Sequence, residues 1–400
     1  MEIHVQKSTI LRPAQETPKQ RLRNSDLDLV APSNYVPQVF FYRRPNYSSP
    51  NFFDAGLLKE ALKKILVPFH PVAGRLPSDE SGRTEILCNG EGVLFVEAET
   101  SCVIDDFGDF AEGPKLLPLL PSFDDTKDNS SYPLMMTQVT RFKCGGVCLA
   151  TRFHHILADG ASTYHFVNSW AEMTRGVPIS IPPFFDRTQI NILREKSKEN
   201  RGSTFQYTRL EVLAAHIWRC VCKARELSDD QASKLHFPAN GRSKLNPPLP
   251  SGYFGNVVFT TALIALSGNI LSEPLNYTVE RIHKALERMN DEYLKSALAY
   301  LRQQPDRTVL RRGAHTYKCP NFNIVYLANM PIYDANFGWG PPMFSRLVNT
   351  YFEGVAHIYP SPSNDGSLTV FINLETHHMQ PFKKLFYEIF QHPKNARSRY

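Results

Sequence analysis

Apolar side chains recur at helical spacing in several stretches of the chain. In the first of these, Asp54 provides a good N-cap and six apolar residues follow it up to Leu66, which is the pattern of an amphipathic helix. The aromatic and aliphatic residues of 161–174 also suit a packed helix. Further helices are predicted over 208–226, over 273–303 as one helix or two, and over 379–391.

Other stretches are apolar and rich in β-branched residues, which is typical of strands. These are 93–98, 134–142, 146–153, 256–266, 322–330, 352–359 and 368–374. The residues between the second and third of them, Lys143 to Gly146, are suited to a tight turn, so these two strands are predicted to form a hairpin. Because strands and helices alternate in both halves, we expect an α/β (α+β) architecture with two sheets of similar size.

A predicted boundary between two domains follows a group of prolines. Pro178, Pro182 and Pro183 break regular structure, and the residues after them are polar and charged up to about Ser203. A chain of 400 residues is long enough for two hydrophobic cores. We therefore expect an N-terminal domain over 1–182, a linker over 183–205 and a C-terminal domain over 206–400.

Composition excludes several classes of function. The formal net charge of +6 is spread along the chain without a basic block, so binding to nucleic acid is not expected. No stretch approaches about 18 uninterrupted apolar residues, and the charged N-terminal segment lacks the apolar core of a signal peptide. Seven scattered cysteines favour a reducing compartment and lack the spacing of a zinc site. A cytoplasmic protein with no membrane span and no metal is expected.

The sharpest chemical feature is the segment 153–160, Phe-His-His-Ile-Leu-Ala-Asp-Gly, at the end of a predicted strand. A His-x-x-x-Asp pattern alone is weak, because it arises by chance in many chains with this many histidines. Its position in a loop after a strand favours chemistry over packing. Imidazole is suited to act as a general base, so His155 is the candidate. Asp159 either orients His155 directly or turns away to hold the loop through a cation.

Two further segments are candidates for ligand contact. Asn336-Phe337-Gly338-Trp339-Gly340 is a turn in which two glycines flank a tryptophan, and it either lets the backbone approach a ligand or packs the indole. The basic turn from Asn240 to Lys244 either meets phosphates or is simply solvated. No Gly-x-Ser-x-Gly elbow is present, which argues against a covalent acyl-enzyme.

Taken together, these motifs resemble the plant BAHD acyltransferases. HHILADG near the middle and NFGWG near the end carry the resemblance, supported by LVPFHPVAGRL, CNGEGVLFVEAE, YFGN and RGAHTYKCPN. The chain is most similar to the hydroxycinnamoyl-CoA transferase branch, which includes shikimate/quinate transferases and rosmarinate synthase. The resemblance implies two chloramphenicol-acetyltransferase-like domains joined by a crossover loop, with the active site in a tunnel between them.

The resemblance also implies roles for individual residues. His155 is the base that deprotonates the acceptor, and the indole N–H of Trp339 lies near the developing oxyanion. Asp159 points away from the substrate and pairs with Arg242. Structural roles fall to Gly160, Asn336, Gly338 and Gly340, and Lys244 is a candidate contact for coenzyme A. An acyl-CoA is the implied co-substrate, with no bound cofactor, an alcohol or amine as acceptor, and a monomeric enzyme.

The chain departs from the family pattern in four places. The usual aspartate of the C-terminal motif is Asn336, which suits a turn but cannot supply charge. The crossover segment after 186–188 is short, which leaves an edge of the second sheet open to exposure. Asn329 stands where we expect shikimate-using relatives to have an arginine, and the early acceptor-lining segment, with Tyr35, Val36, Gln38 and Phe40, is apolar.

These departures affect the expected substrate. A carboxylate held without a cation loses roughly 2–5 kcal/mol, so shikimate and quinate are not the expected acceptors, although Arg346 is a nearby cation that could bind an acid. The leading interpretation is a hydroxycinnamoyl-CoA-dependent transferase of phenylpropanoid metabolism with a changed acceptor. The alternatives are a catalytically impaired relative that binds ligands and an enzyme that uses an aliphatic or benzoyl donor.

Overall fold

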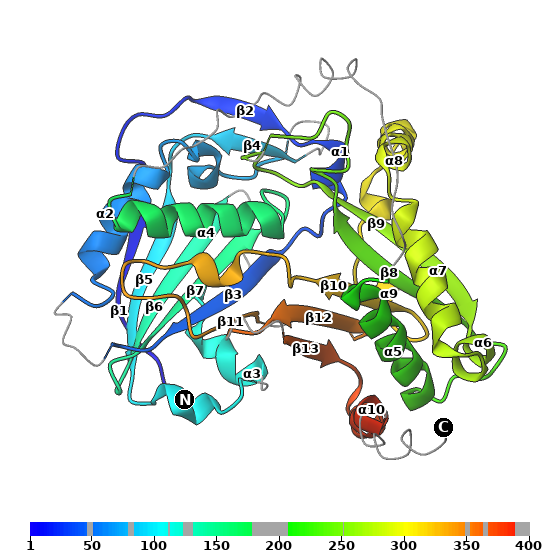
Figure 1. The fold of residues 1–400 in the computed structure, drawn as a ribbon. Helices are drawn as coiled ribbons and strands as arrows, with labels where there is room; N and C mark the ends of the chain where they lie inside the picture. The colour runs from blue at the N-terminus through cyan, green and yellow to red at the C-terminus, as the bar shows by residue number, and fades with distance from the viewer. Residues whose placement is uncertain are drawn as a thin grey trace.

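The computed structural model describes most of the chain in two sheet-containing halves (Figure 1). The residues described are 1–45, 51–78, 84–110, 113–122, 131–177, 207–250, 252–348, 353–362 and 367–388. The predicted linker, 183–205, and the short segment after 186–188 lie outside the described residues.

The first half is built on a six-stranded sheet in the order β1-β5-β6-β7-β3-β11. Its strands are β1 (His4–Leu11), β5 (Val93–Thr100), β6 (Met135–Phe142), β7 (Val147–His154), β3 (Tyr35–Tyr42) and β11 (Phe344–Leu347). Two helices, α2 (Ala55–Ile65) and α4 (Gly160–Thr174), pack together on one face of this sheet (Figure 1). The indole N–H of Trp170 on α4 donates to the carbonyl of Leu58 on α2 at 2.9 Å, which fixes the two helices against each other.

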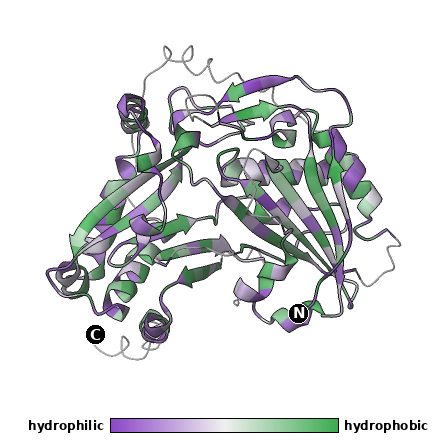
Figure 2. Cartoon of the chain, turned by 180° about the vertical axis from the view of Figure 1, so that it is seen from behind, coloured by the Kyte–Doolittle hydropathy of each residue, from purple (hydrophilic) through white to green (hydrophobic). Residues whose placement is uncertain are grey.

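The second half is built on a five-stranded sheet in the order β13-β12-β10-β8-β9. Its strands are β13 (Leu368–Asn373), β12 (Val355–Pro360), β10 (Phe322–Tyr326), β8 (Ala232–Asn240) and β9 (Val258–Leu266). Its outer face carries α5 (Arg209–Ala224) and α7 (Leu275–Glu287), with α10 (Thr376–Glu388) packed on α5 (Figure 1). Strand β9 forms one edge, and Ile264 on it is 62% exposed. In Figure 2, hydrophobic residues are concentrated on the strands, whereas the helices show mixed colouring.

Shorter elements complete the structure. A two-stranded sheet pairs β2 (Gln20–Arg23) with β4 (Glu85–Cys88). The remaining α-helices are α1 (Asp26–Leu29), α3 (Gly113–Leu116), α6 (Ser267–Ser272), α8 (Asp291–Gln303) and α9 (Ala314–Tyr317). The 3₁₀ helices are η1 (His70–Ala73), η2 (Ile104–Phe107), η3 (Leu117–Leu119), η6 (Thr308–Leu310) and η7 (Ile332–Asp334).

Part of the C-terminal chain segment belongs to the first half of the structure. Strand β11 pairs antiparallel with β3, so that Ser345 lies opposite Phe40 and Arg346 opposite Val39. The core of the first half also includes Phe337 and Tyr359. A boundary drawn in the sequence therefore cannot separate the two cores, because part of 206–400 completes the first sheet.

Most of the predicted elements are present in the structure. The predicted helix behind Asp54 is α2, the hairpin is β6 and β7, and 161–174 corresponds to α4. The prediction of one helix or two over 273–303 was close, since this range holds α7 and α8. Several strands were not predicted, namely β1, β2, β3, β4, β8 and β11. The predicted strand over 322–330 is too long, because β10 ends at Tyr326.

Candidate active site

The loop between β7 and α4 carries the two adjacent histidines at the interface of the two halves. Its position follows from local sequence: β7 ends at His154, and Asp159 caps α4 by accepting a hydrogen bond from the Ser162 N–H at 3.0 Å. The main-chain N–H of His155 donates to the carbonyl of Asn34 at 2.9 Å. His155 is thus held at the end of a central strand of the first sheet.

His154 belongs to the packing of this loop. It is 2% exposed, and its ring meets Tyr35 edge-on with 5.1 Å between centroids. Burial lowers the pKa of His154 to about 3, so its ring is neutral at physiological pH. Its Nδ1 lies 3.4 Å from the main-chain N–H of Ile156. His154 therefore has a structural role, and it is not a candidate for the general base.

His155 has the properties of a general base. Its side chain is half-buried, and burial lowers its pKa below the ordinary value of 6.5, against the opposing effects of its own main chain and of Asp159. The ring therefore stays neutral, and able to accept a proton, at pH 7. The Nδ1 atom is buried and has no hydrogen-bond partner within the described residues.

Asp159 turns away from His155 and binds Arg242. Its two oxygens accept from the Arg242 guanidinium at 2.7 and 3.0 Å, and one of them also accepts from the main-chain N–H of Val257 at 2.9 Å. Arg242 also donates to the Ser162 hydroxyl and the Gly255 carbonyl, both at 2.9 Å. Of the two roles open to Asp159 from the sequence, the geometry supports holding the loop.

An arginine that was not predicted from the sequence influences the pKa of His155. The charge of Arg312, between η6 and α9, lowers the pKa of both His155 and His236. Within the described part of the chain, no hydrogen bond or ion pair occupies the Arg312 guanidinium, although burial lowers its pKa. The doubled arginine in front of the segment Gly313–Tyr317 was the available signal in the sequence.

Two buried polar side chains of the second sheet are further candidates for the site. His236 on β8 and Asn323 on β10 are register partners, and they are 8% and 4% exposed. Their neighbours Leu235 and Ile324 point into the core beneath α5, so His236 and Asn323 face the opposite way, toward the first half. The His236 Nε2 and Asn323 Oδ1 atoms are buried and have no hydrogen-bond partner among the described residues.

Trp339 does not lie near His155, which corrects the role expected for it. The indole packs on Phe53, with 5.1 Å between ring centroids, and the carbonyl of Phe53 accepts from Arg141. Arg141 pairs with Val147 at the start of β7, whereas His155 follows the end of that strand, roughly 23 Å away at the strand rise. An indole at that end of the sheet cannot donate to an oxyanion beside His155.

The rest of the NFGWG segment forms a turn. The side-chain oxygen of Asn336 accepts from the main-chain N–H groups of Gly338 and Gly340 at 2.9 and 3.0 Å. Both glycines have positive φ angles, 106° and 101°, which explains why glycine is needed there. The turn uses an oxygen acceptor and no charge, so asparagine serves in place of aspartate.

The residues expected to line the acceptor pocket lie in different environments. Tyr35 and Val36 pair with His154 and Phe153 close to His155. Further along β3, Gln38 donates to the hydroxyl oxygens of Tyr164 and Ser345 at 2.7 and 3.0 Å. Phe40 is fully buried in the core of the first half and leaves no surface for a ligand, which corrects its expected role.

The remaining predicted residues lie away from the base. Arg346 donates to the Phe110 carbonyl at 2.8 Å and lies 4.1 Å from the centre of the Phe371 ring. It lies opposite Val39, so it projects from the face of the sheet opposite to Gln38 and Phe40. Asn329 is exposed in a turn after β10, and Lys244 is exposed in a turn after β8, whereas Gly160 is the first residue of α4.

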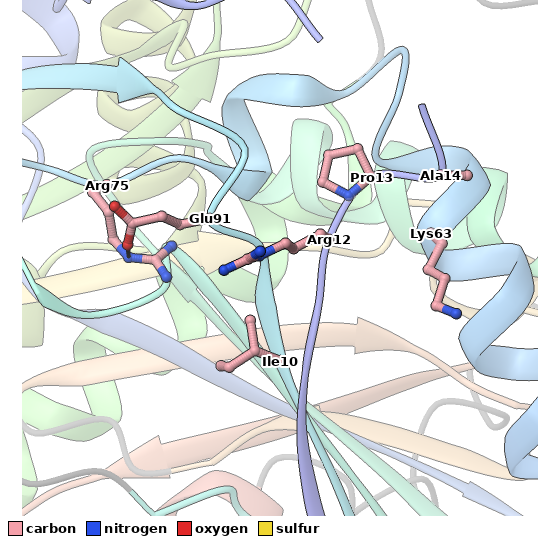
Figure 3. Close-up of a pocket in the computed structure, with 7 residues that line it drawn as sticks. All are labelled: Ile10, Arg12, Pro13, Ala14, Lys63, Arg75 and Glu91. Atoms are coloured by element: carbon pink, nitrogen blue, oxygen red, sulfur yellow. Dashed lines mark ion pairs between the residues drawn. The ribbon is translucent and has the colours of Figure 1, made fainter. Parts of the chain in front are cut away.

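A surface cavity and a histidine cluster lie outside this site. The cavity, of about 750 Å³, contains the ion pair of Arg75 with Glu91 at 3.0 Å, and none of the predicted site residues lines it (Figure 3). Its lining residues are Ile10, Arg12, Pro13, Ala14, Lys63, Arg75 and Glu91.

The histidine cluster lies near the start of α10. Three donor atoms lie within 4.8 Å of one another there, and they belong to Glu375, His377 and His378. The positive end of the helix and the nearby charge of Arg225 disfavour a cation there.

Comparison with known proteins identifies the family. The model of the transferase family matches residues 1–196 and 187–389. A shikimate O-hydroxycinnamoyltransferase of Nicotiana tabacum is 47% identical over 437 residues, covering 97% of this chain and all of that protein. The chain belongs to the BAHD acyltransferases. It is also 42% identical to a hydroxycinnamoyl-CoA:5-hydroxyanthranilate N-hydroxycinnamoyltransferase of Avena sativa and 36% identical to an anthranilate N-benzoyltransferase of Dianthus caryophyllus, each covering 97% of this chain and all of the relative.

Solved structures agree with this acyltransferase fold. Vinorine synthase superposes with a TM-score of 0.76 at 21% identity, covering 95% of this chain and 96% of that chain. F. graminearum TRI101 in complex with coenzyme A and T-2 mycotoxin superposes with a TM-score of 0.73 at 16% identity, covering 91% of this chain and 97% of that chain. The predicted α/β class with two sheets is therefore confirmed. All seven cysteines of this acyltransferase are free.

Two further observations concern the length of the chain and its helices. The alignment with the tobacco relative spans 437 residues although this acyltransferase has 400. The two segments that match the family model overlap at 187–196, which lies within the predicted linker of 183–205. Across the described residues, no helix is both long enough and apolar enough to span a bilayer.

The contacts of Asp159 with Arg242 generate a stability prediction. Both side chains are largely buried, so replacing either one with alanine leaves an unpaired charge and should lower the free energy of unfolding by about 3–5 kcal/mol. Urea unfolding of Asp159→Ala and Arg242→Ala measures this loss. The exposed ion pair of Glu60 with Lys63 provides the matched control, and Glu60→Ala should leave the midpoint unchanged. Equal midpoints for all three variants would contradict the account.

Proposed function

We propose that this enzyme transfers an aromatic acyl group from an acyl-CoA to a hydroxyl or amine of a small acceptor, with His155 as general base. The observation that carries the proposal is the half-buried imidazole directly after β7, whose pKa is lowered by burial. A base that is unprotonated at physiological pH and sits between two sheets can accept a proton from a bound acceptor. Both substrates are bound before transfer, in a ternary complex.

The proposed reaction requires no covalent enzyme intermediate. The acceptor oxygen or nitrogen attacks the thioester carbonyl while His155 takes its proton. The tetrahedral intermediate then collapses, the C–S bond breaks, and the thiolate of coenzyme A leaves and recovers the proton from the imidazolium. Burial raises the pKa of the Cys220 thiol to about 12 and of the Cys222 thiol to about 11, which makes both poor nucleophiles at neutral pH.

We propose a hydroxycinnamoyl or benzoyl group as the donor. The names of the relatives described above state the transfer of a hydroxycinnamoyl or a benzoyl group, and these relatives align with nearly the full length of this chain. TRI101 holds coenzyme A on the same overall fold. Because the relatives include both O- and N-transferases, the same base is proposed to serve an alcohol or an aromatic amine.

We further propose that the acceptor carries a carboxylate and that Arg312 binds it. The charge of Arg312 reaches His155, and its guanidinium has no ion-pair partner within the described residues. Shikimate, 5-hydroxyanthranilate and anthranilate, the acceptors in the relatives' names, are all carboxylic acids. The proposal replaces our expectation from Asn329, which lies exposed in a turn, and shikimate returns as a candidate acceptor.

Substitution of the base tests the core of this proposal. His155→Ala should lower kcat by roughly 10²–10⁴ while leaving thermal unfolding nearly unchanged, because the proton acceptor is lost and the ring is only half-buried. Turnover is measured with p-coumaroyl-CoA, benzoyl-CoA and a panel of acid acceptors by mass spectrometry. His4→Ala, on an exposed part of β1, is the control and should retain wild-type turnover. Near-normal turnover in His155→Ala would rule out the mechanism.

Substitution of the arginine tests the acceptor class. Arg312→Gln should raise KM for a carboxylate acceptor about 30-fold or more, because a lost buried charge contact costs at least about 2 kcal/mol. The KM for the methyl ester of the same acceptor should change little. Arg311→Gln is the matched control, since Arg311 instead donates to the Leu29 carbonyl at 2.9 Å. An equal rise in KM for acid and ester would refute carboxylate binding by Arg312.

A further inference from the structure

The surface cavity outside the proposed active site is lined by more positive than negative side chains. Arg12 follows β1, Lys63 lies on α2 and Arg75 follows η1. Glu91, in the loop before β5, faces these three cations. The described lining therefore carries two positive charges in excess, and a concave surface of this kind attracts anions.

Main-chain contacts fix the walls of this cavity. The N–H of Ala14 donates to the carbonyl of Lys63 at 2.9 Å, which joins the segment after β1 to α2. The N–H of Gly92 donates to the Ala73 carbonyl at 2.9 Å. Gly92 has a φ angle of 96°, and a Cβ atom there would collide with the carbonyl oxygen of Leu11, so glycine is needed for this close approach. The cavity is therefore formed before any ligand binds.

Arg75 supplies a buried cation to the lining. It is 6% exposed, and its Nη1 donates to the carbonyls of Gly74 and Gly92 at 2.8 and 2.9 Å. Its Nε lies 3.0 Å from an oxygen of Glu91, whose side chain is about half exposed. These contacts hold the guanidinium in place, and within the described residues they leave its Nη2 for a ligand.

Arg12 brings a second guanidinium close to the first. Figure 3 shows its side chain extending toward Arg75 and Glu91. Burial lowers the pKa of Arg75, and the charge of Arg12 lowers it further, whereas Glu91 raises it. Arg12 is exposed and makes no hydrogen bond or ion pair within the described part of the chain. An anion between these two guanidinium groups would offset their repulsion.

We propose that this cavity binds the phosphate group of a small phosphate monoester, with Arg12, Lys63 and Arg75 as its cationic contacts. A phosphate monoester carries close to two negative charges at neutral pH, which matches the excess charge of the lining, and guanidinium groups bind phosphate oxygens in pairs. The cavity volume of about 750 Å³ also leaves room for the organic part of the ligand. The apolar part of the lining, which would contact it, consists of Ile10, Pro13 and Ala14.

A phosphate at this site replaces two ion pairs. Glu91 competes with the ligand for Arg75, and Lys63 lies 2.6 Å from Glu60 on the surface of α2. Both carboxylates are largely exposed, and exposed ion pairs contribute little to stability. The ligand therefore exchanges weak contacts for stronger ones. None of the residues proposed for acyl transfer lines the cavity, so this inference does not depend on His155 as the base.

Isothermal titration calorimetry of the full-length wild-type enzyme at low ionic strength tests the site. Glucose 6-phosphate is the probe, glucose is its uncharged control, and inorganic phosphate separates a free ion from an ester. We expect the ester to bind with a Kd of about 1 mM or lower, more tightly than inorganic phosphate, and glucose not to bind. The Kd should rise with added salt, because the contacts are electrostatic. Absence of ester binding, or inorganic phosphate binding as tightly as the ester, would overturn the proposal.

Variants then locate the binding site. Arg12→Gln and Lys63→Gln should each raise the Kd about 5-fold or more, because each removes a charged contact. Glu91→Gln removes the competing carboxylate and should lower the Kd. Lys64→Gln is the matched control, since it removes the same charge from the next residue of α2, which is not among the lining residues, and it should keep the wild-type Kd.

A second control separates the cavity from the region expected to hold an acyl-CoA. Lys244 lies in the exposed turn after β8 and is not among the lining residues. Lys244→Gln should therefore leave the Kd for glucose 6-phosphate unchanged. An equal rise in Kd for Lys63→Gln and Lys64→Gln, or a rise for Lys244→Gln, would refute phosphate binding in the cavity.

Discussion

The buried ion pair of Asp159 with Arg242 is the interaction on which the site depends. It joins the N-cap of α4 in the first half to the turn after β8 in the second. One oxygen of Asp159 also accepts a hydrogen bond from the main-chain N–H of Val257, the residue before β9. Paired charges of this kind are stable inside a protein only when nearly every polar atom is satisfied. That requirement fixes the loop carrying His155 between the two sheets, and it occupies the carboxylate that would otherwise orient the imidazole.

Much of this arrangement could be predicted because it is local. Helical periodicity behind Asp54 and the turn at Gly145 determine α2 and the hairpin of β6 and β7. The pairing of Asp159 with Arg242 was expected, and both hydrogen bonds are present. Strand β11 was missed because it has four residues and is stabilised only by pairing with β3, some 300 positions earlier in the chain. Long-range pairing of this kind leaves no periodic signal in a short segment.

The roles of individual site residues were harder to predict. A motif with two glycines and a tryptophan is as compatible with a structural turn as with a ligand contact, and only the strand register shows that Trp339 lies at the wrong end of the sheet for catalysis. The charge of Arg312 influences His155, and the Asn256 amide donates to the His155 carbonyl, from segments more than 100 positions away. Their importance depends on how the two halves meet, which a single sequence does not contain.

The most direct test of the account is the pH dependence of kcat/KM in the wild-type enzyme. Burial lowers the pKa of His155, so the base stays neutral down to a pH below the ordinary histidine value of 6.5. Activity should therefore fall only as the pH drops through a value below 6.5, and this acidic limb should disappear in His155→Ala. An acidic limb above 6.5, or the same limb in the residual activity of the variant, would contradict the assignment of His155 as the base.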